Sequence, residues 1–328
     1  MPGTGGIPPV AVPPVAIQAP RPDEAGPAAG RRAGRRRPGS DPRNDEGEQP
    51  GGPPAPPARR LISLAVAVVT GLITVGLVFG AQTTRESYGV VVLGVQVLFV
   101  VAWTVASRPP APRVVAAVGL AAAVAADAAA MWVRPASLAP LAYVTAGAFV
   151  AGVVGQLTRP AGRVRVTESL GSTLAVVLGV VAFATLVVLT RHPGGSQAIV
   201  ALLLAAGGAV MLARFSDAVV PYPRLAPQVP RGGVGVVLGA MAGTAVAAGA
   251  GAVLAPLDIT HTAIAGLVTA VVAVVIDLSV GYAEASRRLA GDPPALWVAR
   301  HLQGPLAAFA LAAPAVYASS TLLLVHAL

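Results

Sequence analysis

The pattern of apolar and polar positions divides the chain into a polar first segment and a long apolar remainder. No apolar period runs through residues 1–60, whereas nine continuous apolar runs follow one another from residue 61 onward. A run of about 20 apolar residues crosses a bilayer as a helix, because backbone groups in lipid must pair within their own segment. We expect helices over 61–81, 89–107, 114–133, 138–157, 170–190, 198–212, 234–254, 262–280 and 306–326.

These runs predict an all-α fold, a polytopic integral membrane helical bundle of about nine transmembrane helices. The strands of a membrane barrel would instead alternate between apolar and polar residues. Residues 1–60 contain 15 Pro and 10 Gly, and such a segment cannot bury enough surface to offset its chain entropy. We therefore expect a disordered Pro/Gly/Arg-rich cytoplasmic tail over 1–60 and a transmembrane domain over 61–328.

The distribution of arginines predicts the orientation of the helices. Cytoplasmic loops of membrane proteins carry an excess of positive residues. If the tail is cytoplasmic, the loops on its side carry eleven Arg, and the outer loops carry three, namely Arg85, Arg134 and Arg191. We expect a plasma-membrane protein with its N-terminus in the cytoplasm and its C-terminus outside. Two cytoplasmic loops, 213–233 and 281–305, are long, and long loops are frequent places for function.

Composition narrows the chemistry that this chain can perform. Of its 328 residues 55% are hydrophobic and only 11% are charged, which excludes an ordinary soluble domain. The chain has no Cys, so disulfides, thiolate metal ligands and cysteine nucleophiles are excluded. All 23 basic residues are Arg, and without Lys the chain has no Walker A loop and no Schiff-base lysine. No Cys or second His lies at zinc-ligand spacing from a His, so we assign no zinc site.

Short segments of the C-terminal half stand in the order of one family's motifs. They are Ser216-Asp217, Arg224-Leu-Ala-Pro227, 230–235, Ile276-Asp277-Leu278, 286–292 and Ala313-Pro314-Ala-Val-Tyr317. Through these segments, the region 165–325 resembles a divergent phosphatidate cytidylyltransferase (CDP-diacylglycerol synthase). The resemblance implies a many-helix membrane fold whose cytoplasmic side handles phosphatidic acid, CTP and a divalent metal.

The sequence departs from that family's pattern where the chemistry is most demanding. Nucleotidyl transfer needs carboxylates that hold Mg²⁺ and cations that stabilise the reacting phosphoryl group. The family's Lys pair is missing because the chain has no Lys, and its Asp-Arg pair is missing around Gly304-Pro305. We therefore favour a catalytically inactive relative that binds anionic phospholipid or a membrane-protein partner, with no nucleic acid as partner. An active CTP:phosphatidate cytidylyltransferase using Mg²⁺ and an unrelated small-solute transporter are the alternatives.

The resemblance implies a set of candidate metal or phosphate contacts. Each candidate also has a plain interpretation, as a polar residue at a helix end or as a topology signal. The candidates are Asp217, Asp277, Asp292, Arg287 and Arg288.

Two further features concern the interior of the membrane domain. Asp127 lies within the third apolar run, where a charge costs about 2.5–3.5 kcal/mol, so its side chain should face the bundle interior. We expect Asp127 to form hydrogen bonds across helices, with a proton or ion relay as the alternative. Gly235, Gly239 and Gly243 recur every four residues, which predicts a smooth stripe for close packing inside the bundle.

Overall fold

The computed structural model describes residues 60–158, 165–220, 223–226, 229–293 and 295–324. The tail predicted over 1–60 therefore lies outside the described residues, except for Arg60, where the first helix begins.

Nine helices of the described chain are long and apolar enough to cross a membrane, which confirms the predicted helical multi-pass bundle. A hairpin of the short antiparallel strands β1 (Arg224–Ala226) and β2 (Val229–Gly232) connects α6 to α7. A π-helical turn, η2 (Ser320–Leu324), follows α9. The helices are α1 (Arg60–Gly80), α2 (Arg85–Ser107), α3 (Pro112–Trp132), α4 (Ala139–Leu157), α5 (Val166–Leu189), α6 (Gly195–Val219), α7 (Gly233–Val253), α8 (Ile259–Leu289) and α9 (Trp297–Ser319).

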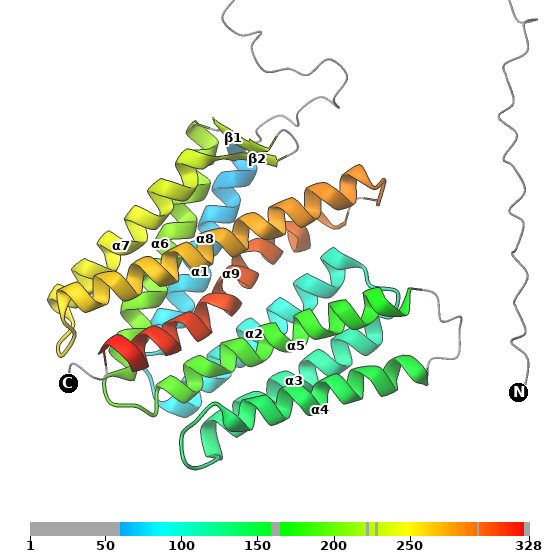
Figure 1. Ribbon diagram of the computed structural model, residues 1–328, viewed down its shortest axis with the longest axis horizontal. Coiled ribbons are helices and arrows are strands. Elements are labelled where there is room, and N and C mark those ends of the chain that lie inside the picture. The colour runs from blue at the N-terminus through cyan, green and yellow to red at the C-terminus, as the bar shows by residue number, and fades with distance from the viewer. Residues whose placement is uncertain (1–59, 159–164, 221–222, 227–228, 294, 325–328) are drawn as a thin grey trace, which may run out of the picture. The chain divides into compact units, whose positions relative to one another are not determined.

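Successive helices run back and forth between two ends of the bundle (Figure 1). We call the end where α1 begins the tail end, and the end where α1 finishes the far end. The β1–β2 hairpin and the connection from α8 to α9 lie at the tail end. The connections from α1 to α2, from α3 to α4 and from α5 to α6 lie at the far end.

The helices pack as two groups that share α9. Helices α6, α7 and α8 pack against one another with α1 on α6, and α2, α3, α4 and α5 form the second group (Figure 1). Helix α9 contacts α8 and α6 on one side and α5 and α2 on the other. Helices α5 and α6 are apolar around most of their circumference and are the most buried, as expected for helices surrounded by others.

Apolar side chains occupy both the core and the outer surface of the bundle. Phe99, Phe183 and Phe309 are buried in the core. Phe79 and Val253 are 72% and 81% exposed. Large apolar side chains exposed along whole helices would aggregate in water, whereas lipid tails cover them in a bilayer.

Helices α6, α8 and α9 extend into the two long loops predicted at 213–233 and 281–305, so both connections are shorter than predicted. Helix α6 continues to Val219, α8 continues to Leu289, and α9 begins at Trp297, so only 290–296 separate α8 from α9. Charged residues ended the predicted runs, but their side chains pair with one another, so the helices continue through them. Asp277 consequently lies well inside α8 rather than near its end.

The long helix α8 begins with a side-chain cap. Asp258 is its N-cap residue, and its Oδ2 accepts a hydrogen bond of 2.9 Å from the backbone N–H of His261. The ring Nδ1 of His261 lies 2.8 Å from the same oxygen. The hydrogen bond from the backbone N–H, together with the ring contact, lowers the pKa of the Asp258 carboxyl below its usual value.

The glycine stripe of α7 packs inside the bundle, as its spacing predicted. Gly235, Gly239 and Gly243 are all buried. A Cβ at Gly239 would lie 2.7 Å from the carbonyl oxygen of Ala209, and one at Gly243 would lie 2.8 Å from that of Ala205. The stripe therefore lets the backbone of α7 approach α6 more closely than any side chain would allow.

Candidate functional site

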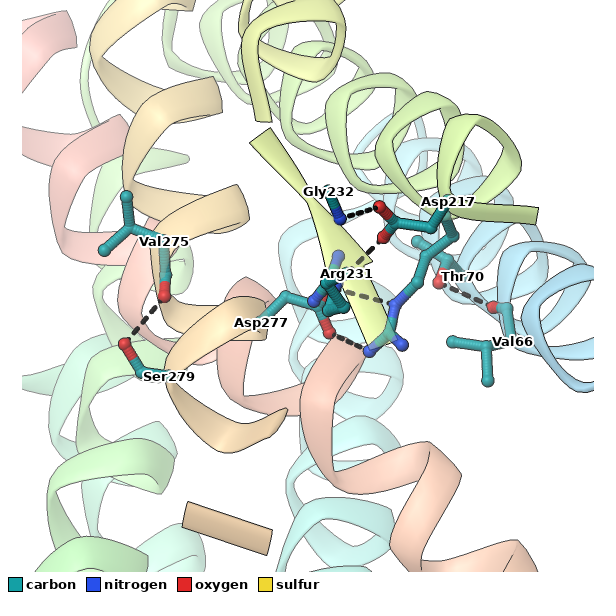
Figure 2. A network of polar contacts seen from close by, with 9 residues as sticks. Val66, Thr70, Asp217, Arg231, Gly232, Val275, Asp277 and Ser279 are labelled. Carbon is teal, nitrogen blue, oxygen red and sulfur yellow. Dashed lines mark hydrogen bonds and ion pairs between the residues drawn. The ribbon is translucent and has the colours of Figure 1, made fainter. Parts of the chain in front are cut away.

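Asp217 lies near the tail end of α6 and is paired rather than open to solvent. Its side chain is 4% exposed. Arg231 of β2 donates from Nε to Oδ2 of Asp217 at 2.9 Å, and the backbone N–H of Gly232 donates to Oδ1 at 2.9 Å (Figure 2). The β1–β2 hairpin thus folds over the end of α6 because its second strand supplies both donors.

Asp277 of α8 is fully buried and accepts hydrogen bonds from two arginines. Arg214 of α6 donates from Nε to Oδ2 at 2.9 Å and from Nη2 to Oδ1 at 2.5 Å, a two-pronged contact. Arg231 donates from Nη1 to Oδ2 at 2.8 Å (Figure 2). Both carboxylate oxygens are therefore occupied by guanidinium donors.

Arg214, Asp217, Arg231 and Asp277 form one formally neutral network, which we call the aspartate–arginine network. Arg231 links the two carboxylates and is itself 5% exposed. Burial alone would lower the pKa of Arg231, but the carboxylates of Asp277 and Asp217 raise it above its usual value. Such a network is stable in a low-dielectric interior only when every charge has its partner.

Two glycines make room for the aspartate–arginine network. A Cβ at Gly235 of α7 would lie 2.7 Å from Oδ1 of Asp217. A Cβ at Gly304 of α9 would lie 3.0 Å from Nη2 of Arg214 and closer still to Oδ1 of Asp277. Helices α6, α7, α8 and α9 and strand β2 therefore all meet around these charges.

The aspartate–arginine network does not fit a divalent metal. The oxygens of Asp217 and Asp277 that would hold Mg²⁺ accept hydrogen bonds from Arg231, Arg214 and a backbone N–H. A dication inserted among them would meet two guanidinium groups at hydrogen-bond distance from the same oxygens. In the part of the chain that the structure describes, no three His, Asp or Glu side chains are grouped for a metal ion.

Arg287, Arg288 and Asp292, the other predicted contacts, gather around a different feature. They line a pocket of about 140 Å³ at the tail end, which we call the tail-end pocket. Arg108 at the end of α2 and Arg165 at the start of α5 also line it. The five residues predicted from the resemblance are therefore divided between two places, one buried and one open.

Glu284 organises the arginines beside the tail-end pocket. Its side chain, 14% exposed, lies 3.0 Å from Nη2 of Arg287, 3.1 Å from Nε of Arg288 and 3.7 Å from Nη1 of Arg300. One carboxylate is thus shared by three guanidinium groups, which leaves an excess of positive charge. Because these groups sit one helical turn apart or on the adjacent α9, the pairing holds them in place.

Backbone strain is concentrated at the same pocket. Among the described residues, Arg108 and Arg165 are the non-glycine residues with positive φ, at 48° and 59°. Arg108 also precedes a proline, a position that disfavours helical backbone. A strained residue of this kind costs of order 1–3 kcal/mol, and such residues cluster at functional sites. The strain is therefore a second indication, beside the arginine lining, that this pocket is a functional site.

Asp127 faces the bundle interior, as the sequence predicted. Its side chain is 3% exposed, and Oδ1 accepts a hydrogen bond of 3.0 Å from Nε2 of Gln96 on α2. The same Nε2 donates to the carbonyl oxygen of Val180 on α5 at 2.9 Å. This contact supports the interpretation of Asp127 as a group that ties three helices together.

Sequence reasoning missed the partners that define the aspartate–arginine network. Arg214 entered only among the eleven arginines that indicate orientation, Arg231 also within the segment 230–235, and Gly304 only as a departure from a motif. The sequence did contain a signal for a buried ion pair. Arg214 lies one helical turn before Asp217 at the end of an apolar helix, and a charge in such a place needs a buried partner. Which partner it finds depends on helix packing, which the sequence pattern does not contain.

Comparison with protein-family models, curated proteins and solved structures finds no match to this chain. The described residues define a helical multi-pass membrane protein with a buried aspartate–arginine network and an arginine-lined pocket at one end.

Proposed function

We propose that this protein binds the phosphate headgroup of an anionic phospholipid in the tail-end pocket and does not transfer nucleotides. The observation that carries the proposal is the pocket itself, lined by Arg108, Arg165, Arg287 and Arg288 from three different helices or their ends. Guanidinium groups match phosphate oxygens in geometry and charge, and arginine is the preferred residue for such recognition.

The location of the pocket agrees with a lipid ligand. It opens where α2 ends, α5 begins and α8 ends, at the level where transmembrane helices meet headgroups. Each arginine near an anionic membrane surface contributes about 1 kcal/mol of attraction. Glu168, Glu284 and Asp292 also line the pocket and offset part of its positive charge, which favours a compact phosphate over a general attraction to the surface.

The proposal places the tail end in the cytoplasm, in the plasma membrane, with the C-terminus outside. Of the eleven arginines predicted on that side, Arg159 and Arg163 lie outside the described residues. Arg214 and Arg231 pair with aspartates inside the bundle, so they do not act as surface charges. The seven that remain still outnumber the three at the far end, and the positive-inside rule supports this orientation.

The non-catalytic part of the proposal rests on the engaged carboxylates. The resemblance to phosphatidate cytidylyltransferase implies Mg²⁺ held by groups such as Asp217 and Asp277. In this chain those two carboxylates neutralise Arg214 and Arg231. We therefore expect no Mg²⁺-dependent formation of CDP-diacylglycerol from CTP and phosphatidic acid by the purified protein, with an active synthase as positive control. Clear turnover would overturn this part.

The binding part is tested with lipid nanodiscs. Purified protein is exchanged between nanodiscs of phosphatidylcholine alone and nanodiscs containing phosphatidic acid, and bound lipid is counted by native mass spectrometry. We expect retention of phosphatidic acid by the wild type and about tenfold or greater loss in Arg287→Gln/Arg288→Gln. Arg113→Gln removes an exposed arginine at the same end that does not line the pocket, so it serves as the matched control. Equal retention by all three proteins contradicts headgroup binding here.

A further inference from the structure

The far end of the bundle has few arginines, and the fold brings them together. Arg85 is the first residue of α2, whereas Arg134 and Arg191 lie in the connections from α3 to α4 and from α5 to α6. In the structure all three line one open hollow of about 430 Å³, which we call the far-end hollow. Its other lining residues are Met131, Trp132, Pro135 and Ala136, and no carboxylate of the described chain lines it.

Arg191 is held in place by the end of α3. Its Nη1 donates hydrogen bonds to the backbone carbonyl oxygens of Ala130 at 2.9 Å and Val133 at 2.6 Å. These carbonyls belong to the last turn of α3 and its C-cap, where a positive charge is favourable. A guanidinium anchored through one nitrogen keeps its remaining N–H groups in a fixed position beside the hollow.

Arg85 and Arg134 are not neutralised by the protein. Both side chains are exposed, and neither forms an ion pair or hydrogen bond with any described residue. The tail-end pocket differs, because Glu284 and Glu168 pair with its arginines. Three guanidinium groups around one hollow repel one another, and an anion bound among them removes that repulsion.

The position of the hollow indicates which anions can reach it. Trp132, one of its lining residues, ends α3 and is 72% exposed. Exposed tryptophans at the ends of transmembrane helices lie at the headgroup level of the bilayer. The far-end hollow is therefore open both to headgroups of the adjoining leaflet and to ions in the aqueous phase beside it.

We infer that the far-end hollow, bounded by Arg85, Arg134 and Arg191, is a binding site for a phosphate-bearing anion. The site lies at the opposite end of the bundle from the tail-end pocket, so it is independent of the headgroup site proposed above. Its ligand is either the phosphodiester of an anionic phospholipid or free phosphate. Both present oxygens that a cluster of guanidinium groups recognises.

The test uses the full-length protein in nanodiscs and variants at the two exposed arginines. Arg85→Gln/Arg134→Gln removes two of the three cations, whereas Arg191 is left intact because it also caps α3. Arg85→Lys/Arg134→Lys keeps the charge and removes the forked donors. Arg113→Gln, an exposed arginine at the tail end, is the matched control. Unchanged thermal unfolding, measured by circular dichroism, shows that each variant is folded.

Two arms distinguish the sources of the anion. All proteins in both arms also carry Arg287→Gln/Arg288→Gln, so that the tail-end pocket does not contribute to the binding measured. In the first arm, native mass spectrometry counts phosphatidylglycerol retained from mixed nanodiscs. In the second arm, calorimetry measures inorganic phosphate binding in phosphatidylcholine nanodiscs. A lipid ligand predicts retention that falls about tenfold or more in the Gln variant and falls less in the Lys variant. A free-phosphate ligand predicts binding in the second arm alone, again with a larger loss in the Gln variant than in the Lys variant. Binding in neither arm, or equal losses in Arg113→Gln, would overturn the site.

Discussion

Replacing Asp277 by Asn tests whether the aspartate–arginine network is structural. Asp277 is fully buried and accepts three charge-assisted hydrogen bonds, at 2.9, 2.5 and 2.8 Å, from Arg214 and Arg231. The amide has no charge and turns an N–H₂ toward one of the donors. The network then holds two guanidinium groups and one carboxylate, so one buried positive charge is left without compensation.

We expect Asp277→Asn to destabilise the folded protein by about 3–5 kcal/mol, the usual cost of removing one member of a buried pair. Restoring neutrality should recover part of this loss, so Asp277→Asn/Arg214→Gln is expected to be more stable than the single variant. The double-mutant cycle isolates the coupling between the two side chains. Asp292→Asn makes the same chemical change at an exposed carboxylate and should leave stability unchanged.

The assay is unfolding of the purified protein in mixed micelles by added sodium dodecyl sulfate, followed by circular dichroism. If Asp277→Asn unfolds at the same mole fraction of sodium dodecyl sulfate as the wild type, the structural role of the aspartate–arginine network is refuted. A double variant no more stable than the single one would refute it as well. A carboxylate that held a catalytic metal would behave differently, because Asp277→Asn would abolish turnover and leave the unfolding curve in place.

Three further predictions concern packing, orientation and pH. Gly239→Ala should destabilise the bundle by about 1–3 kcal/mol, because its Cβ would press on a carbonyl oxygen of α6. Gly249→Ala is the control, because no atom lies within 4 Å of the added carbon, and it should leave stability unchanged. Unfolding by sodium dodecyl sulfate compares the stability of the two variants. The chain has no Cys, so a single introduced Cys can be labelled selectively with an impermeant maleimide. Gln82→Cys at the far end should be labelled on intact cells, and Ala290→Cys at the tail end only after permeabilisation. The reverse pattern would show the opposite orientation. The lowered pKa of Asp258 means that its stabilising cap is present above the ordinary aspartate pKa and is lost as pH falls through the lower, folded-state value. As pH falls, the thermal unfolding temperature of the wild type should decrease more than that of Asp258→Asn, which keeps a capping oxygen but does not titrate. Parallel plots of unfolding temperature against pH for the two proteins would contradict this role.

The fold class was predictable because the bilayer imposes a strict rule on the backbone. Apolar runs of spanning length must be helices, and all nine predicted runs lie within helices of the described structure or overlap them. Helix ends were less predictable. The predicted apolar runs ended at Leu212 and Val280, whereas α6 and α8 continue to Val219 and Leu289. Hydropathy treats every charge as exposed, so it ends a helix where a paired charge lets the helix continue.

The candidate site was predictable only in its ingredients. The sequence indicated Asp217 and Asp277 as polar groups in the tail-end half of the bundle, and Asp127 as a group that faces inward. It did not indicate that Arg231, from a hairpin, would join both aspartates, because that contact depends on how the hairpin folds over α6 and α8. It also did not separate Arg287 from the aspartates, although the fold places Arg287 at the tail-end pocket.

Composition and spacing by themselves determined that this chain spans a membrane with helices, where the apolar centre of each helix lies, and that α7 packs through glycine. These properties follow from local rules, namely backbone pairing in lipid and the short reach of a residue without a side chain. Only the tertiary structure decided which charges neutralise one another and which remain open. Arg214 and Arg85 are chemically identical in the sequence, but packing surrounds one with carboxylate and leaves the other beside an open hollow.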